Sequence, residues 1–132
     1  MSAWDGYLTE HVVGSGHVDK ALLIDQTGQA VWGKGSEVEM TPQEMNSLAF
    51  AFNDASTAQK EGILVEGEKY ILTTILDIDN IPIMHCPKGK QGIIAAKCTT
   101  SILVTHYNES TPAQSALSHV VGQAKHLIGY KL

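Results

Sequence analysis

Apolar side chains recur at helical spacing near both ends of the chain, which is 132 residues long. Near its start, large side chains share one helical face: Trp4, Tyr7, Leu8, His11 and Val12. Ser2 can cap this helix, and Gly14-Ser15-Gly16 supplies its end. Near its other end, Thr111 and Pro112 repeat the pattern of a helix N-terminus, and a broad apolar face follows up to Gly129: Ala113, Ala116, Leu117, Val120, Val121, Ala124, Leu127 and Ile128. The sequence therefore predicts an amphipathic helix at each end.

Between these helices, apolar runs are short and separated by turn residues, which is typical of β-strands. Ala21–Ile24 and Ala30–Trp32 flank a turn that contains Gly28. Ile63–Val65 and Tyr70–Leu72 flank Glu66-Gly67, so both pairs are predicted to form hairpins. Four more runs follow at short intervals: Ile75-Leu76, Pro82–Met84, Ile93–Ala96 and Ser101–Val104. Short connections favour antiparallel neighbours in a sheet.

One further helix is predicted to begin at Thr41-Pro42-Gln43-Glu44. This segment has a capping hydroxyl, a proline at the first helical position and a glutamate three residues after the cap. The helix would bury a stripe of apolar side chains: Met45, Leu48, Ala49 and Phe52. The whole pattern predicts an α+β fold with helices packed on the faces of a central antiparallel sheet, and we expect residues 1–132 to form a single domain.

Composition and charge exclude several classes of function. The net charge is −5 and only nine residues are Lys or Arg, so a general nucleic-acid binder, which needs a basic surface, is not expected. No apolar run approaches the ~20 residues that a membrane span requires. Cys86 and Cys98 lack the spacing of a disulfide framework or a metal site, so we expect free thiols and a cytosolic protein.

The residues that could carry catalysis or bind metal show no recognised spacing. None of the six histidines fits a zinc motif: His11, His17, His85, His106, His119 and His126. Gly14-Ser15-Gly16-His17 does not have the pattern of a nucleophile elbow. Asp77, Asp79 and Asn80 resemble the start of a calcium loop, but the later ligands are missing, and we interpret them as a solvated turn. We therefore expect no enzyme, no bound metal and no cofactor.

Several lysines could share one face of the predicted sheet. Lys88-Gly89-Lys90-Gln91-Gly92 lacks the pattern of a phosphate-binding loop and is interpreted as a hairpin turn. Together with this turn, a basic patch would comprise Lys69, Lys88, Lys90, Lys97 and Lys125. Such a patch would suit an acidic protein surface or anionic lipid head groups.

Large aromatic side chains are the most specific signal in the chain. If the two terminal helices lie side by side, Trp4 and Tyr7 meet His126 and Tyr130, and Trp32 reaches them from its strand. Such a groove suits a polyproline II ligand, because proline rings stack on aromatic faces and the ligand carbonyls accept hydrogen bonds. The alternative is that Trp4 and Trp32 only pack the seam between the helices.

The chain resembles the profilin family over nearly its full length. The matching segments are Trp4-Asp-Gly-Tyr7, Gly14-Ser15-Gly16-His17-Val18-Asp19-Lys20-Ala21, Ala30-Val31-Trp32, Gly62-Ile63 through Gly67-Glu68-Lys69-Tyr70, His106-Tyr107 and His126-Leu127-Ile128-Gly129. The resemblance implies a sheet of about seven antiparallel strands, with the terminal helices on one face and smaller helices on the other. It also implies a cytoplasmic protein of the cytoskeleton with two separate protein-binding surfaces.

The first implied surface lies between the terminal helices and binds proline-rich segments of actin-assembly factors such as formins. Its positions here are Trp4, Tyr7, Trp32, His126 and Tyr130. Many relatives end in an aromatic residue where this chain ends in Leu132, so the groove is expected to differ at that end.

The second implied surface binds monomeric actin, regulates polymerisation and in many members speeds nucleotide exchange on actin. Its positions here are Lys69, Thr74, Lys90, Lys97, Thr99, Gln114, Leu117 and Ser118. Many relatives have an arginine where this chain has Thr74, and the connection from Asp77 to Gly89 is longer than usual. The alternative function is therefore an adaptor that binds proline-rich peptides or phosphoinositides with weak or no actin binding. Phosphoinositides would use the lysines named above.

Overall fold

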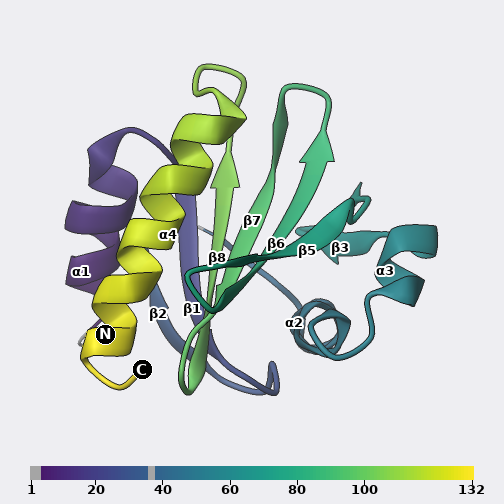
Figure 1. Cartoon of the computed structure of the whole chain (residues 1–132), viewed down its shortest axis with the longest axis horizontal. Helices are drawn as coiled ribbons and strands as arrows, with labels where there is room; N and C mark the ends of the chain where they lie inside the picture. Colours follow the sequence, from purple (N-terminus) through teal and green to yellow (C-terminus); the bar gives the residue numbers. More distant parts are fainter. Residues whose placement is uncertain (1–3, 36–37) are drawn as a thin grey trace.

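The computed structural model describes residues 4–35 and 38–132, without the side chain of Thr74, and the proposed cap Ser2 lies outside this part. Its strands form two antiparallel sheets (Figure 1). The larger sheet has the order β2-β1-β8-β7-β6-β5, and the smaller one pairs β3 with β4. The strands are β1 Lys20–Asp25, β2 Val31–Lys34, β3 Ile63–Val65, β4 Glu68–Tyr70, β5 Thr74–Ile78, β6 Ile81–Lys88, β7 Gln91–Lys97 and β8 Ser101–Tyr107. Each predicted strand run overlaps an observed strand, and the antiparallel pairing is confirmed.

The main sheet has six strands in the described chain, where about seven were expected. The difference lies in the β3–β4 hairpin, which packs its buried side chains on the core and forms a sheet of its own. Glu66 and Gly67 close this hairpin with φ of 54° and 81°. The chain leaves β4 after Tyr70, two residues earlier than predicted, and rejoins the main sheet where the Thr73 N–H donates to the His85 carbonyl (3.2 Å).

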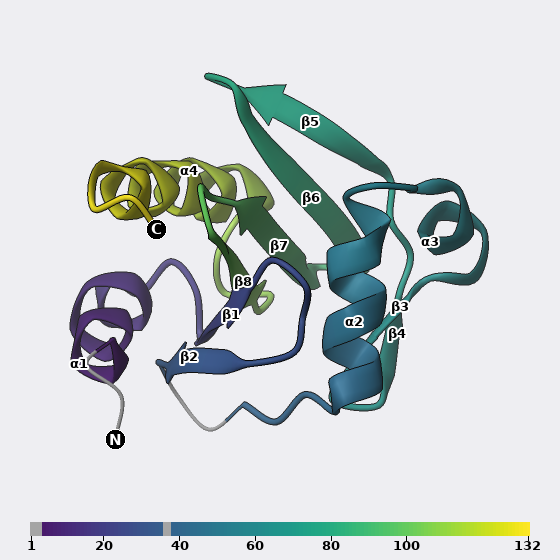
Figure 2. The same cartoon turned by 90° about the horizontal axis from the view of Figure 1, so that it is seen from below.

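Helices cover both faces of the main sheet, as predicted, and the two groups are separated by it (Figure 2). The first helical segment and α4 (Ala113–Gly129) lie on one face, where they pack on residues such as Leu23, Ile94 and Leu103. Helices α2 (Pro42–Ala51) and α3 (Ser56–Glu61) belong to the other face, and α2 packs on residues such as Leu22 and Ile93. No helix in the described chain is long and apolar enough to cross a membrane.

The first helical segment changes pitch along its length. It passes from α1 (Asp5–Tyr7) through a π-helical turn, η1 (Leu8–Val12), into a 3₁₀ turn, η2 (Val13–Ser15). Gly16 then adopts a left-handed conformation (φ 84°) and its N–H bonds to the Val13 carbonyl, which confirms the predicted glycine stop.

Two glycines allow this segment to approach β2 very closely. A Cβ atom at Gly33 would lie 2.9 Å from the Trp4 Cβ, and one at Gly35 would lie 3.0 Å from the Leu8 Cβ. The contact at Gly33 is shorter than real Cβ atoms show, so glycine is needed there, and the contact at Gly35 would require Leu8 to shift. The Asp5 carboxylate also accepts a hydrogen bond from the Lys34 N–H (2.9 Å). The start of the first helix is therefore fixed against the edge of the sheet.

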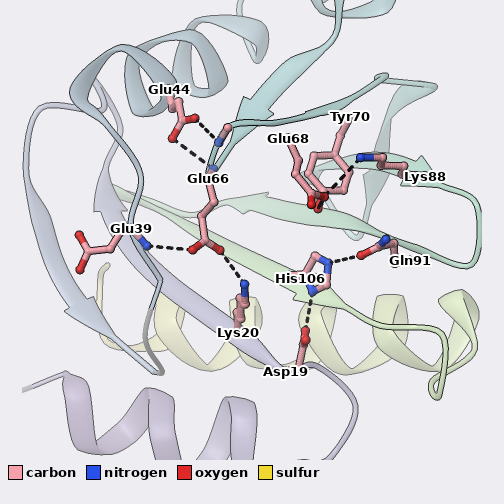
Figure 3. A network of polar contacts seen from close by, with 11 residues as sticks. Asp19, Lys20, Glu39, Glu44, Glu66, Glu68, Tyr70, Lys88, Gln91 and His106 are labelled. Carbon is pink, nitrogen blue, oxygen red and sulfur yellow. Dashed lines mark hydrogen bonds and ion pairs between the residues drawn. The ribbon is translucent and has the colours of Figure 1, made fainter.

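Glu44 joins the start of α2 to the β3–β4 turn (Figure 3). Its carboxylate accepts from the Thr41 N–H (3.0 Å), while the Thr41 hydroxyl accepts from the Glu44 N–H (3.1 Å), which confirms the predicted capping box. The same carboxylate accepts from the backbone N–H groups of Glu66 (3.2 Å) and Gly67 (2.8 Å). Because Glu44 is only 7% exposed, these bonds are shielded from water.

The start of α4 differs from the prediction at Thr111. The N-cap residue is Pro112, which has no side chain to bond the helix, and the Thr111 hydroxyl instead donates to the Gly16 carbonyl (3.2 Å). Thr111 is one residue too early to cap α4. Its hydroxyl links the beginning of α4 to the end of the first helical segment.

We predict that Glu44→Ala lowers the free energy of unfolding by about 2–4 kcal/mol, because a cap is lost and buried N–H groups lose their acceptor. Urea denaturation followed by circular dichroism measures this. Glu39→Ala is the matched control, since the Glu39 side chain is 83% exposed and its bond to Lys34 is a surface ion pair. Equal stability of the two variants would contradict the role of Glu44.

Candidate functional site

A groove runs between the first helical segment and the second half of α4. It has a volume of about 620 Å³ and is lined by Trp4, Tyr7, His11, Gly122, Gln123, His126 and Tyr130. Four of the five aromatic positions predicted from the sequence belong to this lining. The two ends of the chain therefore build one site, as the helical spacing of these residues predicted.

Tyr7 lies at the centre of the aromatic cluster. Its ring stacks on His126 with centroids 5.6 Å apart and planes 8° apart, and it meets Trp4 edge to face at 5.6 Å and 88°. His11 lies on a third side, with centroids 5.5 Å apart. Offset stacking and edge-to-face contacts of this kind are the favoured arrangements of aromatic pairs. Each ring thus limits the movement of its neighbours, and the groove is formed before any ligand enters.

The hydroxyl of Tyr7 crosses to the opposite helix and donates to the Gln123 side-chain oxygen. Burial, with smaller contributions from the neighbouring Cys98 and Tyr130, raises the pKa of Tyr7 to about 12. The phenol therefore stays neutral and keeps its proton at all physiological pH values. Because Gln123 accepts that proton, the amide N–H groups of Gln123 are donors that the groove offers to a ligand.

Tyr130 closes one end of the groove and is 62% exposed. Its ring meets His126 at 5.1 Å and Trp4 at 6.1 Å, both edge to face. The chain beyond it is held to the β7–β8 turn, because the Leu132 carbonyl accepts from the backbone N–H and the hydroxyl of Ser101 (3.0 and 3.1 Å) and also from Thr100. This anchor fixes the last residues and with them the position of Tyr130.

Trp32, which was predicted to reach the groove, does not belong to its lining. It lies on β2, is partly buried and packs against the core beneath the terminal helices. Its neighbour Gly33 supports the backbone of Trp4. In the described chain Trp32 thus lies beside the groove, and its contact with a ligand stays a prediction.

Sequence reasoning missed three residues that line the groove: His11, Gly122 and Gln123. Gly122 lies inside α4, where glycine is unfavourable, and a Cβ atom there would meet nothing within 4 Å. An unexplained glycine in the middle of an amphipathic helix was the signal available. Its missing side chain widens the groove at that point.

The residues expected to bind actin lie on different parts of the molecule. Lys90 is in the turn before β7, whereas Lys97 ends β7 and Thr99 follows it, so these positions lie at opposite ends of one strand. Lys69 is exposed on β4 of the small sheet, and Thr74 begins β5. The described side chains of this set do not form one compact site.

Three further positions of that set lie on the first turns of α4. Gln114 and Ser118 line a shallow hollow of about 450 Å³ beside His17. Leu117 is partly buried and packs against the core under α4. This part of the set faces the end of the first helical segment.

The five lysines expected to share a face are also distributed. Lys88 forms an ion pair with Glu68 (3.3 Å), and Lys125 on α4 forms one with Asp79 in the β5–β6 turn (2.5 Å). Both pairs are exposed and neutralise part of the expected basic patch. The turn predicted at residues 88–92 is confirmed, with Gly89 at φ 64°.

Other candidate chemistry can be placed as well. Cys86 and Cys98 are free and buried, and burial raises their pKa values to about 12 and about 11, which makes both thiols unreactive. No group of three or more His, Cys, Asp or Glu side chains in the described chain could hold a metal ion. Asp79 and Asn80 form the β5–β6 turn with positive φ, in agreement with the interpretation as a turn.

Comparison with known proteins gives consistent matches along the chain. The Profilin family model matches residues 2–132. The profilin of Schizosaccharomyces pombe is 31% identical over 96% of this chain and 97% of its own. The solved structure of Acanthamoeba castellanii profilin IA has a TM-score of 0.87 at 31% identity, covering 98% of this chain and all of its own.

Two more distant structures contain bound partners. Mouse profilin IIa in complex with a double repeat from the FH1 domain of mDia1 has a TM-score of 0.76 at 14% identity, covering 99% of this chain and all of its own. LokiProfilin2 in complex with rabbit actin has a TM-score of 0.71 at 16% identity, covering 98% of both chains. At these identities the similarity concerns the fold.

We predict that Gly122→Ala raises the free energy of unfolding by about 0.5–1 kcal/mol, because alanine favours the helix and its methyl group meets no neighbour. Gly33→Ala is the matched comparison and should lower it, since its methyl group would collide with Trp4. Thermal and urea denaturation measure both. Destabilisation by Gly122→Ala would show that this glycine has a structural role instead of widening the groove.

Proposed function

Because the chain belongs to the profilin family, we propose that it binds proline-rich segments in the groove between its terminal helices and actin monomers on a second surface. The observation that carries the first part is the aromatic lining of the groove, built from both ends of the chain. In this role the protein joins actin monomers to proline-rich partners such as formins in the cytoplasm and regulates actin polymerisation.

The groove has the chemistry that a polyproline II helix requires. Such a segment has no internal hydrogen bonds, so its carbonyl groups are free to accept, and its rings offer flat apolar faces. Trp4, Tyr7, His126 and Tyr130 supply aromatic surfaces, and the side-chain amide of Gln123 supplies N–H donors. Little ordering is needed on either side, because the ligand is already extended and the rings already contact one another.

The length of the groove favours an extended ligand over a compact one. Its lining runs along α4 from Gly122 to Tyr130, and along the first helical segment from Trp4 to His11. Seven residues of a helix span ~10 Å, which corresponds to about three residues of polyproline II at 3.1 Å each. The groove therefore suits a short proline run. The FH1 repeat bound by mouse profilin IIa supports this assignment at the level of the fold.

The second surface is proposed from the residues that match the family and from the complex of LokiProfilin2 with rabbit actin. It comprises Lys69, Thr74, Lys90, Lys97, Thr99, Gln114, Leu117 and Ser118. None of these residues lines the groove, so the two proposed surfaces share no residue. Since Lys90 and Lys97 lie at opposite ends of β7, separate charge reversals can locate the contact with actin.

For the groove, we predict that Trp4→Ala weakens binding of a decaproline peptide by at least about 30-fold, the loss typical of a central aromatic contact. Isothermal titration calorimetry measures the affinity. The matched control is Phe50→Ala, because Phe50 is an exposed aromatic residue (58%) on α2, across the sheet from the groove. Unchanged peptide affinity in folded Trp4→Ala would contradict the assignment. A loss from Trp32→Phe would extend the binding site to β2.

For actin, we predict that Lys97→Glu and Lys90→Glu each weaken binding of monomers by about tenfold and leave peptide affinity unchanged, because reversal removes an attraction and adds a repulsion. Fluorescence titration of labelled actin monomers measures this. Lys60→Glu is the control, since Lys60 is an exposed lysine on α3 outside the proposed surface. If only one reversal has an effect, actin contacts that end of β7. If the wild-type protein does not bind actin, the peptide-binding adaptor is the correct function.

A further inference from the structure

His17 and His119 form a pair beyond the end of the aromatic groove. Their rings stack with centroids 5.1 Å apart and planes 25° apart. His17 follows the glycine stop of the first helical segment, and His119 lies on α4 before the groove-lining Gly122. Both histidines border the hollow of about 450 Å³ that Gln114, Ser115 and Ser118 also line. The proposed peptide site does not use either side chain.

One hydrogen bond defines which nitrogen of the His119 ring carries the proton. The Nε2 atom of His119 lies 3.0 Å from the Val12 carbonyl, which can only accept, so Nε2 carries the hydrogen. In neutral His119 the lone pair therefore resides on Nδ1. The Ser15 hydroxyl donates to the same carbonyl (3.0 Å) and contacts both rings, at 3.0 Å from Nε2 of His119 and 3.2 Å from Nδ1 of His17.

His119 has the arrangement that metal-binding histidines require. A histidine that binds a metal through one nitrogen usually donates the other N–H to a carbonyl or another acceptor, which fixes the ring and its tautomer. Here the Val12 carbonyl holds His119 in this way. Nδ1 of His119 and Nε2 of His17 have no protein partner among the hydrogen bonds of the described chain.

We propose that His17 and His119 together bind a divalent late first-row transition metal ion, such as Cu²⁺ or Zn²⁺, at the junction of the terminal helices. Imidazole nitrogen suits these ions, which bind it at about 2.0–2.1 Å. His17 is exposed, so its ring can leave the stacked position and its contact with Ser15 and direct Nε2 towards an ion held by His119. Water completes the coordination, because the hollow is open to solvent. Besides the two histidines, it is lined by the polar residues Gln114, Ser115 and Ser118.

The expected consequence is a bridge between the end of the first helical segment and the start of α4. These segments are otherwise joined there by hydrogen bonds from His119 to Val12 and from Thr111 to Gly16. An ion that binds only the folded arrangement adds to its stability in proportion to the logarithm of its concentration. Metal binding should therefore raise the melting temperature.

The test is isothermal titration calorimetry of the whole chain with ZnCl₂ and CuCl₂, with electron paramagnetic resonance of the Cu²⁺ complex. We expect saturable binding of one ion, tighter for Cu²⁺ than for Zn²⁺, and a spectrum with nitrogen ligands. His17→Gln and His119→Gln should each weaken binding at least about tenfold, and the double variant should abolish it. His11→Gln is the control for metal binding, since His11 is outside the hollow.

The melting temperature provides an independent measurement. Zn²⁺ should raise the melting temperature of the wild type and of His11→Gln, but not that of His17→Gln or His119→Gln. Absence of saturable binding by the wild type would overturn the proposal. So would binding that survives in the double variant, or a loss of affinity in His11→Gln as large as that in His17→Gln. Decaproline affinity is expected to be the same in His17→Gln and the wild type. Failure of the metal-site proposal can therefore be distinguished from failure of the proposed peptide site.

Discussion

The close approach of the first helical segment to β2 is the constraint on which the binding groove depends. Gly33 on β2 lets Trp4 approach to a distance that a side chain on the strand would not permit, and Gly35 just after β2 leaves little room beside Leu8. Once the helix lies there, Trp4 and Tyr7 face α4 at ring-contact distance. A larger residue at either glycine would shift the helix and separate one wall of the groove from the other.

The opposite wall depends on a different interaction. Helix α4 packs on the sheet through buried small and aliphatic side chains such as Ala116, Val120 and Leu127. Small residues let the helix lie close to the sheet, and this leaves the other face of α4 to form the groove. The scaffold on the far side of the sheet, held by Glu44, takes no part in the groove. The groove and the Glu44 network thus lie on opposite faces of the main sheet.

Local signals in the sequence predicted most of the fold. The capping box at Thr41 and Glu44, the glycine stop at Gly16 and the hairpin turn at Glu66-Gly67 each determine a conformation within a few residues. Such features can be identified from sequence because their physical cause is local. The aromatic face shared by Trp4 and Tyr7 was visible for the same reason, and it correctly indicated one wall of the groove.

Features that depend on distant segments could not be predicted in this way. Whether the β3–β4 hairpin joins the main sheet depends on its packing against the core, which no local pattern specifies. To predict that Trp32 lies beside the groove and Gly122 within it, one would need to know how β2, α4 and the first helical segment lie relative to one another. The pairing of His17 with His119 is the clearest case, because the two residues lie near opposite ends of the sequence and meet only where α4 packs beside the first helical segment.

The anchoring of Leu132 at Thr100 and Ser101 has a thermodynamic consequence for the two proposed binding surfaces. Tyr130 at the end of the groove and Thr99 in the β7–β8 turn are joined through this short tether. If a ligand on one surface orders or displaces this tether, the affinity on the other surface must change as well. Linkage then requires the effect to be reciprocal and equal in free energy.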